Sequence, residues 1–120
     1  PAPLAPRGRG ELHHAAQESA RRTKKYGTAE WAQIRAESEA IYARLAELMR
    51  GGAAVDDPRV RAEIEAHRAH LTRWFYPCSP RMQRGLAELY VADARFTANL
   101  DKAGGAGFAR FLHDAIVAAT

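Results

Sequence analysis

The sequence Phe75-Tyr76-Pro77-Cys78-Ser79-Pro80-Arg81-Met82 joins two predicted helices and is the predicted functional stretch of the chain. Each of its prolines lacks a backbone N–H and fixes its own φ, so the connection is stiff. Ser79 is a good N-cap, and Pro80 suits the first turn of the helix that follows. Cys78, the single cysteine of the chain, therefore lies just before a helix N-terminus, where the partial positive charge favours a thiolate.

Two interpretations of Cys78 stay open on residue chemistry alone. The aromatic residues Trp74, Phe75 and Tyr76 precede it, and an activatable thiol beside flat apolar surface suits the capture of an electrophilic, apolar ligand. A free cysteine is also among the residue types most often buried, where it behaves as a small hydrophobic residue. In that case the two prolines form only a stiff connector and Cys78 is unreactive.

Helices are predicted on both sides of this stretch, and no window shows the two-residue alternation of a β-strand. Asp57-Pro58 is an N-cap and first-turn pair that opens one helix, and Gly51-Gly52 ends the helix before it. The sequence therefore predicts an all-α domain of about five helices with a weakly anchored N-terminal helix. The predicted helices cover residues 11–26, 29–50, 58–75, 80–92, 94–99 and 106–119.

Apolar residues at three- and four-residue spacing predict one buried face on each helix of the body. Ser38 interrupts the apolar stripe of the longest helix. The predicted faces are Trp31, Ile34, Ile41, Leu45 and Leu48; Val60, Ile64, His67, Leu71 and Trp74 or Phe75; Met82, Leu86, Leu89 and Tyr90; Phe96 and Leu100; and Phe108, Leu112, Ala115, Ile116 and Ala119.

The first 27 residues differ from the rest in charge and in apolar content. They hold six Lys or Arg and two Glu, whereas the remaining residues are balanced, so the net charge of +4 is confined to this segment. Residues 1–10 are predicted to be a disordered lead-in, and residues 11–120 the helical domain. The helix over 11–26 offers only Leu12 and Tyr26 as large apolar residues, so we expect it to be mobile unless something docks on it.

The composition narrows the class of protein. At 120 residues the chain is one domain, with no secretory signal and no apolar stretch long enough to span a membrane. A single cysteine allows no intrachain disulfide, so we expect a cytoplasmic protein. The balanced charge of the body predicts no basic nucleic-acid-binding face, although the basic leading segment remains a candidate contact for nucleic acid or an acidic partner.

Two chemical alternatives centre on the helix over 58–75. Glu63, His67 and His70 share one face, as three zinc ligands would, but their spacing is that of no recognised zinc motif. A cysteine hydrolase needs a base within hydrogen-bonding reach of Cys78, and both histidines lie two to three helical turns back. We therefore predict no metal, no cofactor and no catalytic activity.

Five aromatic residues lie between positions 74 and 96 of an alanine-rich chain. Most must be core, because a small domain needs its aromatic residues inside. Consecutive residues 74, 75 and 76 cannot all face one way, so at least one is expected to line a surface or a cleft. Clefts between the helices of a bundle are common ligand sites.

Several motifs occur together in residues 18–119, and the run from Tyr90 to Asp101 is the most specific. The motifs are Thr28-Ala29-Glu30-Trp31, His67, Tyr76-Pro77-Cys78 with Met82, Glu88-Leu89-Tyr90-Val91-Ala92-Asp93-Ala94-Arg95-Phe96-Thr97-Ala98-Asn99-Leu100-Asp101, and Arg110-Phe111-Leu112-His113-Asp114-Ala115-Ile116. With these motifs, residues 18–119 resemble the TipA-type antibiotic-recognition domains, the drug-binding C-terminal domains of MerR-type regulators that respond to thiopeptides.

The resemblance implies an incomplete globin-like helical arrangement with a hydrophobic cleft, and an N-terminal segment that orders over the bound drug. It implies that Cys78 corresponds to the cysteine that adds to a dehydroalanine of the antibiotic. DNA would be bound only through a separate domain absent from this chain. The ligand-binding residues implied or expected are Cys78, Tyr76, Met82, Tyr90, Phe96 and Trp74.

Two departures and one rival accompany the resemblance. The chain has Gly105-Ala106-Gly107 where the family tends to place Pro-Gly, and Pro80 where an aromatic residue is expected. The rival is a helical module that binds a protein or nucleic acid through its basic leading helix, with a structural Cys78. Salt-sensitive binding to DNA or to an acidic peptide would favour that rival.

Overall fold

The computed structural model describes residues 4–120, with side chains described from residue 10 onward. These residues form six helices and no strand, which confirms the predicted all-α fold. The helices are α1 Leu4–Thr23, α2 Thr28–Arg50, α3 Pro58–Trp74, α4 Pro80–Ala92, α5 Ala94–Gly104 and α6 Phe108–Ala118.

Short polar side chains begin three of the helices. The carboxylate of Asp57 accepts a hydrogen bond from the Arg59 N–H at the start of α3, and Asp93 does the same for Arg95 at the start of α5. The Ser79 hydroxyl accepts from the Met82 N–H at the start of α4. Each cap satisfies a backbone donor that has no partner inside its helix. These side chains set the helix boundaries that surround the site.

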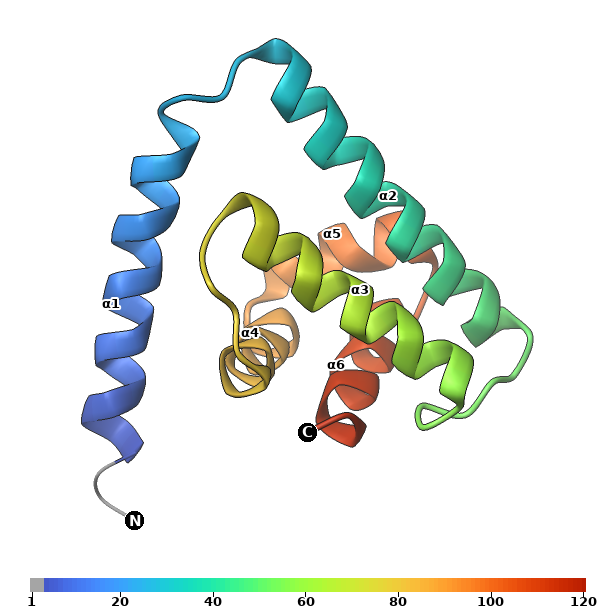
Figure 1. Cartoon of the computed structure of the whole chain (residues 1–120). Coiled ribbons are helices and arrows are strands. Elements are labelled where there is room, and N and C mark those ends of the chain that lie inside the picture. Colours follow the sequence, from blue (N-terminus) through green and yellow to red (C-terminus); the bar gives the residue numbers. More distant parts are fainter. Residues whose placement is uncertain (1–3) are drawn as a thin grey trace.

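The helices enclose one hydrophobic core. In Figure 1, α1 and α2 diverge from the linker over residues 24–27, and α3 to α6 lie between them. The core gathers side chains from α2 to α6, and no α1 residue from position 10 onward belongs to it. The largest apolar side chains that are almost fully buried are Leu45, Val60, Ile64, Phe108, Leu112 and Ile116.

Helices α1 and α5 differ in length from the prediction. Helix α1 begins at Leu4 and ends at Thr23 rather than covering 11–26, and α5 continues to Gly104 rather than ending at 99. The expected disordered lead-in over 1–10 lies partly outside the described residues, and from Leu4 the backbone is helical. Residues 4–10 contain proline and glycine, which have the lowest helix propensities, so the sequence predicts no helix there.

The buried face of α4 also differs from the prediction. Gln83, Ala87 and Tyr90 are buried, whereas Leu89 is exposed. The face is turned because α4 packs most closely on α6, where the small Ala87 allows close approach, and because Gln83 finds a buried polar partner on α3. The small side chain of Ala87 and the hydrogen bond of Gln83 therefore determine which face of α4 is buried, and the apolar pattern of the sequence shows neither.

Phe108 fixes the corner between α5 and α6. A Cβ on Gly104 would lie 2.2 Å from Cγ of Phe108, which is fully buried in the core. We expect Gly104→Ala to lower the free energy of unfolding by about 2–3 kcal/mol, because the ring has no room to move. Urea unfolding measures this change.

Gly85→Ala is the matched control. Gly85 lies inside α4 with nothing within 4 Å of an added Cβ, so the substitution should stabilise the protein by up to about 1 kcal/mol through helix propensity. Equal effects of the two substitutions would contradict the packing at Gly104.

Candidate functional site

The connection from α3 to α4 is held by hydrogen bonds that continue neither helix. The Tyr76 N–H donates to the carbonyl of Leu71, and the Cys78 N–H donates to Oγ1 of Thr72 at 3.0 Å. In a continuing helix these two N–H groups would donate to the carbonyls of Thr72 and Trp74. The turn therefore leaves both carbonyls available to donors from elsewhere in the chain.

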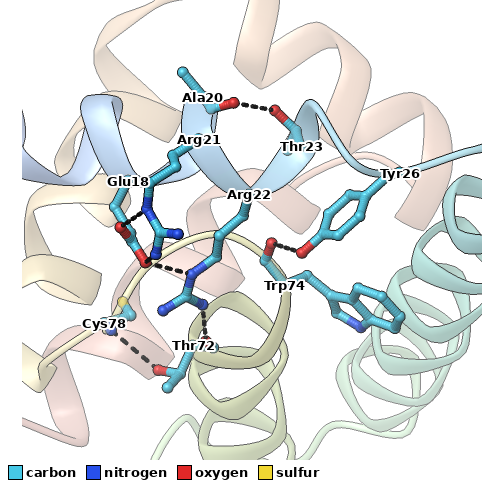
Figure 2. Close-up of polar contacts among 9 residues, drawn as sticks. All are labelled: Glu18, Ala20, Arg21, Arg22, Thr23, Tyr26, Thr72, Trp74 and Cys78. Atoms are coloured by element: carbon cyan, nitrogen blue, oxygen red, sulfur yellow. Dashed lines mark hydrogen bonds and ion pairs between the residues drawn. The ribbon is translucent and has the colours of Figure 1, made fainter.

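Helix α1 and its linker supply those donors. Nη1 of Arg22 donates to the Thr72 carbonyl at 2.8 Å, and the Tyr26 hydroxyl donates to the Trp74 carbonyl (Figure 2). Glu18 orients Arg22 by accepting from its Nε at 2.6 Å. The carbonyls at a helix C-terminus carry partial negative charge, which favours a guanidinium. We call these contacts of Arg22 and Tyr26 the α1 anchor.

A pocket of about 500 Å³ lies between α1 and the turn. We call it the α1 pocket. Its walls combine apolar surface from the turn with polar and charged side chains of α1, so it suits a ligand with both kinds of group. It is lined by Glu11, His14, Ala15, Gln17, Glu18, Arg21, Tyr76, Pro77 and Met82.

Cys78 lies beside this pocket but is 4 % exposed. Burial raises the pKa of its thiol to about 11, while Arg68 and a hydrogen bond with Tyr76 act in the opposite direction. The expectation that the start of α4 would favour a thiolate is therefore wrong, because loss of solvent outweighs the partial charge of the helix. Burial also raises the pKa of Tyr76 to about 12. Both groups are neutral at pH 7.

A second cavity, of about 330 Å³, lies along α2 and α3. We call it the aromatic groove. Its walls carry four aromatic rings, and Tyr90 and His67 lie buried at its floor. It is lined by Trp31, Ile34, Arg35, Ser38, Glu39, Tyr42, His67, His70, Leu71, Phe75 and Tyr90.

The structure separates the six predicted ligand-binding residues. Tyr76 and Met82 line the α1 pocket with Cys78 beside them, as described above. Tyr90 lines the aromatic groove instead. Trp74 is buried and donates from Nε1 to Glu37 at 2.7 Å. Phe96 is exposed, and its ring centroid lies 5.9 Å from that of Tyr90.

Residues 74, 75 and 76 face three ways. Trp74 points into the protein, Phe75 lines the aromatic groove and Tyr76 lines the α1 pocket. The prediction that at least one of them lines a cleft is confirmed. This short segment therefore separates the two cavities.

Sequence reasoning missed most of the residues that line the two cavities. The α1 side chains of the pocket carry no motif. The interrupted apolar stripe of α2 could have indicated the groove. Ser38 follows Trp31 by seven residues and precedes Tyr42 by four, so all three lie on one helix face. Trp31 was expected in the core, but it is 39 % exposed at the groove.

The three residues of the zinc alternative have separate partners. Glu63 pairs with Arg44 at 2.9 Å, Nε2 of His70 lies 3.1 Å from the Ile34 carbonyl, and Nδ1 of His67 receives a hydrogen bond from Gln83. Among residues 4–120 no three His, Cys, Asp or Glu side chains are placed to hold a metal ion. Within the same residues no helix is both long and apolar enough to cross a membrane.

The chain matches known proteins over nearly its whole length. The family model described as the TipAS antibiotic-recognition domain matches residues 10–119. The HTH-type transcriptional activator mta of Bacillus subtilis is 38% identical over 102 residues, which cover 85% of this chain and 38% of the relative. The HTH-type transcriptional activator TipA of Streptomyces coelicolor is 35% identical over 104 residues, 87% of this chain and 41% of the relative. The chain thus spans about two-fifths of these relatives.

A solved structure shares the fold. TipAS of Streptomyces lividans, solved in complex with nosiheptide as part of a thiopeptide antibiotic multidrug resistance system, superposes with a TM-score of 0.82. The two chains are 34% identical, and the match covers 88% of this chain and 73% of that one.

The α1 anchor predicts a selective effect of Arg22. We expect Arg22→Met to lower amide hydrogen-exchange protection in α1 by roughly tenfold, because a charge-assisted hydrogen bond to the body is lost. Arg21→Met is the matched control, because Arg21 also donates to Glu18 and both of these hydrogen bonds lie within α1. Equal loss in both variants, or no loss in Arg22→Met, would contradict the anchor.

His67 predicts a pH dependence of stability. Burial lowers the pKa of its imidazole to about 4 from the ordinary 6.5, so below pH 6.5 the unfolded chain binds a proton that the folded chain does not. Stability is therefore lost as the pH falls from 6.5 towards 4, by about 2 kcal/mol between pH 7 and pH 5. Urea unfolding at both pH values measures this loss. In His67→Gln the stability lost between pH 7 and pH 5 should be smaller by that amount. An unchanged loss would show that His67 is not the group responsible.

Proposed function

Because the chain belongs to the TipAS antibiotic-recognition family, we propose that it binds a thiopeptide-like antibiotic in the α1 pocket, with Cys78 as the attachment point. The observation that carries the proposal is the position of this pocket, between a sparsely attached helix and the turn that holds Cys78. Tyr76 and Met82 provide apolar contact on the body side. The antibiotic would fill the space between the two sides.

The attachment of α1 supports a binding mode in which the ligand holds the helix. Ala15 is the buried apolar residue among the described side chains of α1, and Leu12 is 59 % exposed. The other described contacts are the α1 anchor, an ion pair of Arg81 with Glu11, and a ring contact of Tyr26 in the linker with Trp74. A ligand in the pocket adds the apolar surface that α1 lacks, so binding and ordering of α1 reinforce each other.

Attachment at Cys78 would be a Michael addition to a dehydroalanine of the ligand. The thiolate sulfur bonds to the terminal alkene carbon, and the alkene electron pair moves to the α-carbon, which takes up a proton. The thiol proton leaves to solvent, so the net change is addition of S–H across C=C with no redox step. Because the thiol is buried and its pKa is about 11, reversible binding comes first and bond formation is slow.

The protein is a stoichiometric binder in this proposal, not an enzyme. The relatives it matches are transcriptional activators of more than twice its length. We propose that the domain works either as the effector part of a MerR-type regulator, with DNA bound by a separate domain, or as a free drug-binding protein. In both cases the cellular site of action would be the cytoplasm.

The rival function is a helical interaction module with a structural Cys78. The burial of Cys78 and the raised pKa of its thiol favour this rival for the cysteine itself. It accounts for neither the α1 pocket nor the placement of Tyr76 and Met82 in it. Salt-sensitive binding to DNA or an acidic peptide, without antibiotic binding, would support it.

Intact-protein mass spectrometry with nosiheptide tests the attachment. We expect the wild-type chain to gain the mass of one ligand and Cys78→Ala to gain none. The rate should rise by about tenfold for each pH unit between pH 7 and pH 9, because the thiolate fraction rises in that proportion below the pKa.

Ligand-dependent thermal melting separates binding from attachment. Cys78→Ala should still be stabilised by nosiheptide, since the pocket does not depend on the sulfur. No melting shift and no adduct in either protein would reject antibiotic binding. A melting shift in both without any adduct would reject only the role of Cys78.

A further inference from the structure

Cys78 is buried, but it is not the hydrophobic core that buries it. Among the described side chains, Cys78 belongs neither to the core nor to the partly buried residues packed against it. Its neighbours in the turn, Pro77 and Ser79, are both exposed. The S–H group of Cys78 has a local acceptor, the Ser79 carbonyl at 3.7 Å. The burial of this thiol therefore depends on the element that lies over the turn.

Helix α1 is that element. Thr72 contacts both sides, because its hydroxyl accepts from the Cys78 N–H at 3.0 Å and its carbonyl accepts from Arg22 of α1 at 2.8 Å (Figure 2). Ala15 of α1 is buried and lies outside the core, as Cys78 does. Ala15 also lines the α1 pocket together with Pro77 of the turn. Docking of α1 on the turn therefore shields both buried side chains from solvent.

The docked helix is held mainly near one end. The α1 anchor joins Arg22 and Tyr26, at the C-terminal end of α1 and in the linker, to the end of α3. Nearer the N-terminus, Glu11 and Arg81 of α4 form an ion pair at 3.7 Å in which both side chains are about one-third exposed. Exposed ion pairs contribute little stability. Local opening of α1 is therefore much easier than unfolding of the core.

We propose that α1 is an autoinhibitory cover on Cys78, which is unreactive while α1 is docked and becomes an accessible thiol when α1 opens. Opening returns the sulfur to solvent beside the N-terminus of α4, whose partial charge favours a thiolate. It also removes the burial that raises the pKa of the thiol to about 11. The inert and the reactive interpretations of Cys78 are then two states of one residue. The role of this cover in antibiotic capture rests on the function proposed above, and it makes opening of α1 the step before attachment.

Alkylation by iodoacetamide measures the cover directly. The thiolate sulfur bonds to the reagent's carbon, iodide leaves, and the thiol proton passes to the buffer. Because Cys78 is the single cysteine, intact-protein mass spectrometry of the full chain follows this reaction, with Cys78→Ala as the blank. A covered thiol reacts only in the open fraction of molecules, so the rate is proportional to that fraction.

Two variants weaken the anchor without touching the turn. Arg22→Met removes the charge-assisted bond to α3 and should speed alkylation roughly tenfold. Tyr26→Phe removes the hydroxyl bond to α3 but keeps the ring between Trp31 and Trp74, and should speed alkylation about threefold. Arg21→Met is the matched control, because the bonds of Arg21 to Glu18 lie within α1, and it should leave the rate unchanged.

Gly104→Ala separates opening of α1 from unfolding of the whole domain. This substitution disturbs the core at Phe108 and leaves the anchor intact, so its alkylation rate should stay within about twofold of the wild-type rate. If only global unfolding exposed the thiol, the rate would instead rise by about 30- to 150-fold, in proportion to the stability lost.

Several results would overturn the proposal. These are an unchanged rate in both anchor variants, an equal increase in Arg21→Met, and a larger increase in Gly104→Ala than in Arg22→Met. Iodoacetamide reports on the cover without any antibiotic. Failure of nosiheptide to bind would therefore reject the antibiotic proposal, whereas a nosiheptide adduct together with unchanged alkylation in the anchor variants would reject only the cover.

Discussion

The carbonyl groups of Thr72 and Trp74, at the C-terminal end of α3, are the constraint on which the candidate site depends. They are free because the turn that follows sends the Tyr76 and Cys78 N–H groups to other acceptors. The α1 anchor uses both carbonyls, and α1 supplies most of the lining of the α1 pocket. Thr72 links the turn to α1, because its hydroxyl accepts from the Cys78 N–H and its carbonyl accepts from Arg22 (Figure 2).

Local chemistry made the starts of α3, α4 and α5 predictable. The caps at Asp57, Ser79 and Asp93 act over two or three residues, so the sequence alone shows them. The state of Cys78 was not predictable in the same way. The charge of a helix N-terminus follows from the sequence, whereas the burial that outweighs it depends on packing between distant segments. The family resemblance, rather than residue chemistry, named Met82 as a site residue, and Met82 lines the α1 pocket.

The two cavities show the limit of pattern reading in another form. Aromatic residues were expected to gather in one cleft near the turn, but Tyr76 and Tyr90 lie in different cavities. The buried bond between Gln83 and His67 joins positions 16 residues apart on separate helices, and no local pattern marks it. A polar residue within an apolar stripe, such as His67 on α3, indicates a buried partner without identifying it.

The most direct test of the central claim is an NMR measurement of contacts between bound nosiheptide and the methyl groups of Ala15 and Met82, which face the α1 pocket from its two sides. We expect intermolecular nuclear Overhauser effects from the ligand to both methyl groups, and none to Met49, which lies against the core on α2. Contacts to neither Ala15 nor Met82 in a saturated complex would contradict the α1 pocket as the antibiotic site.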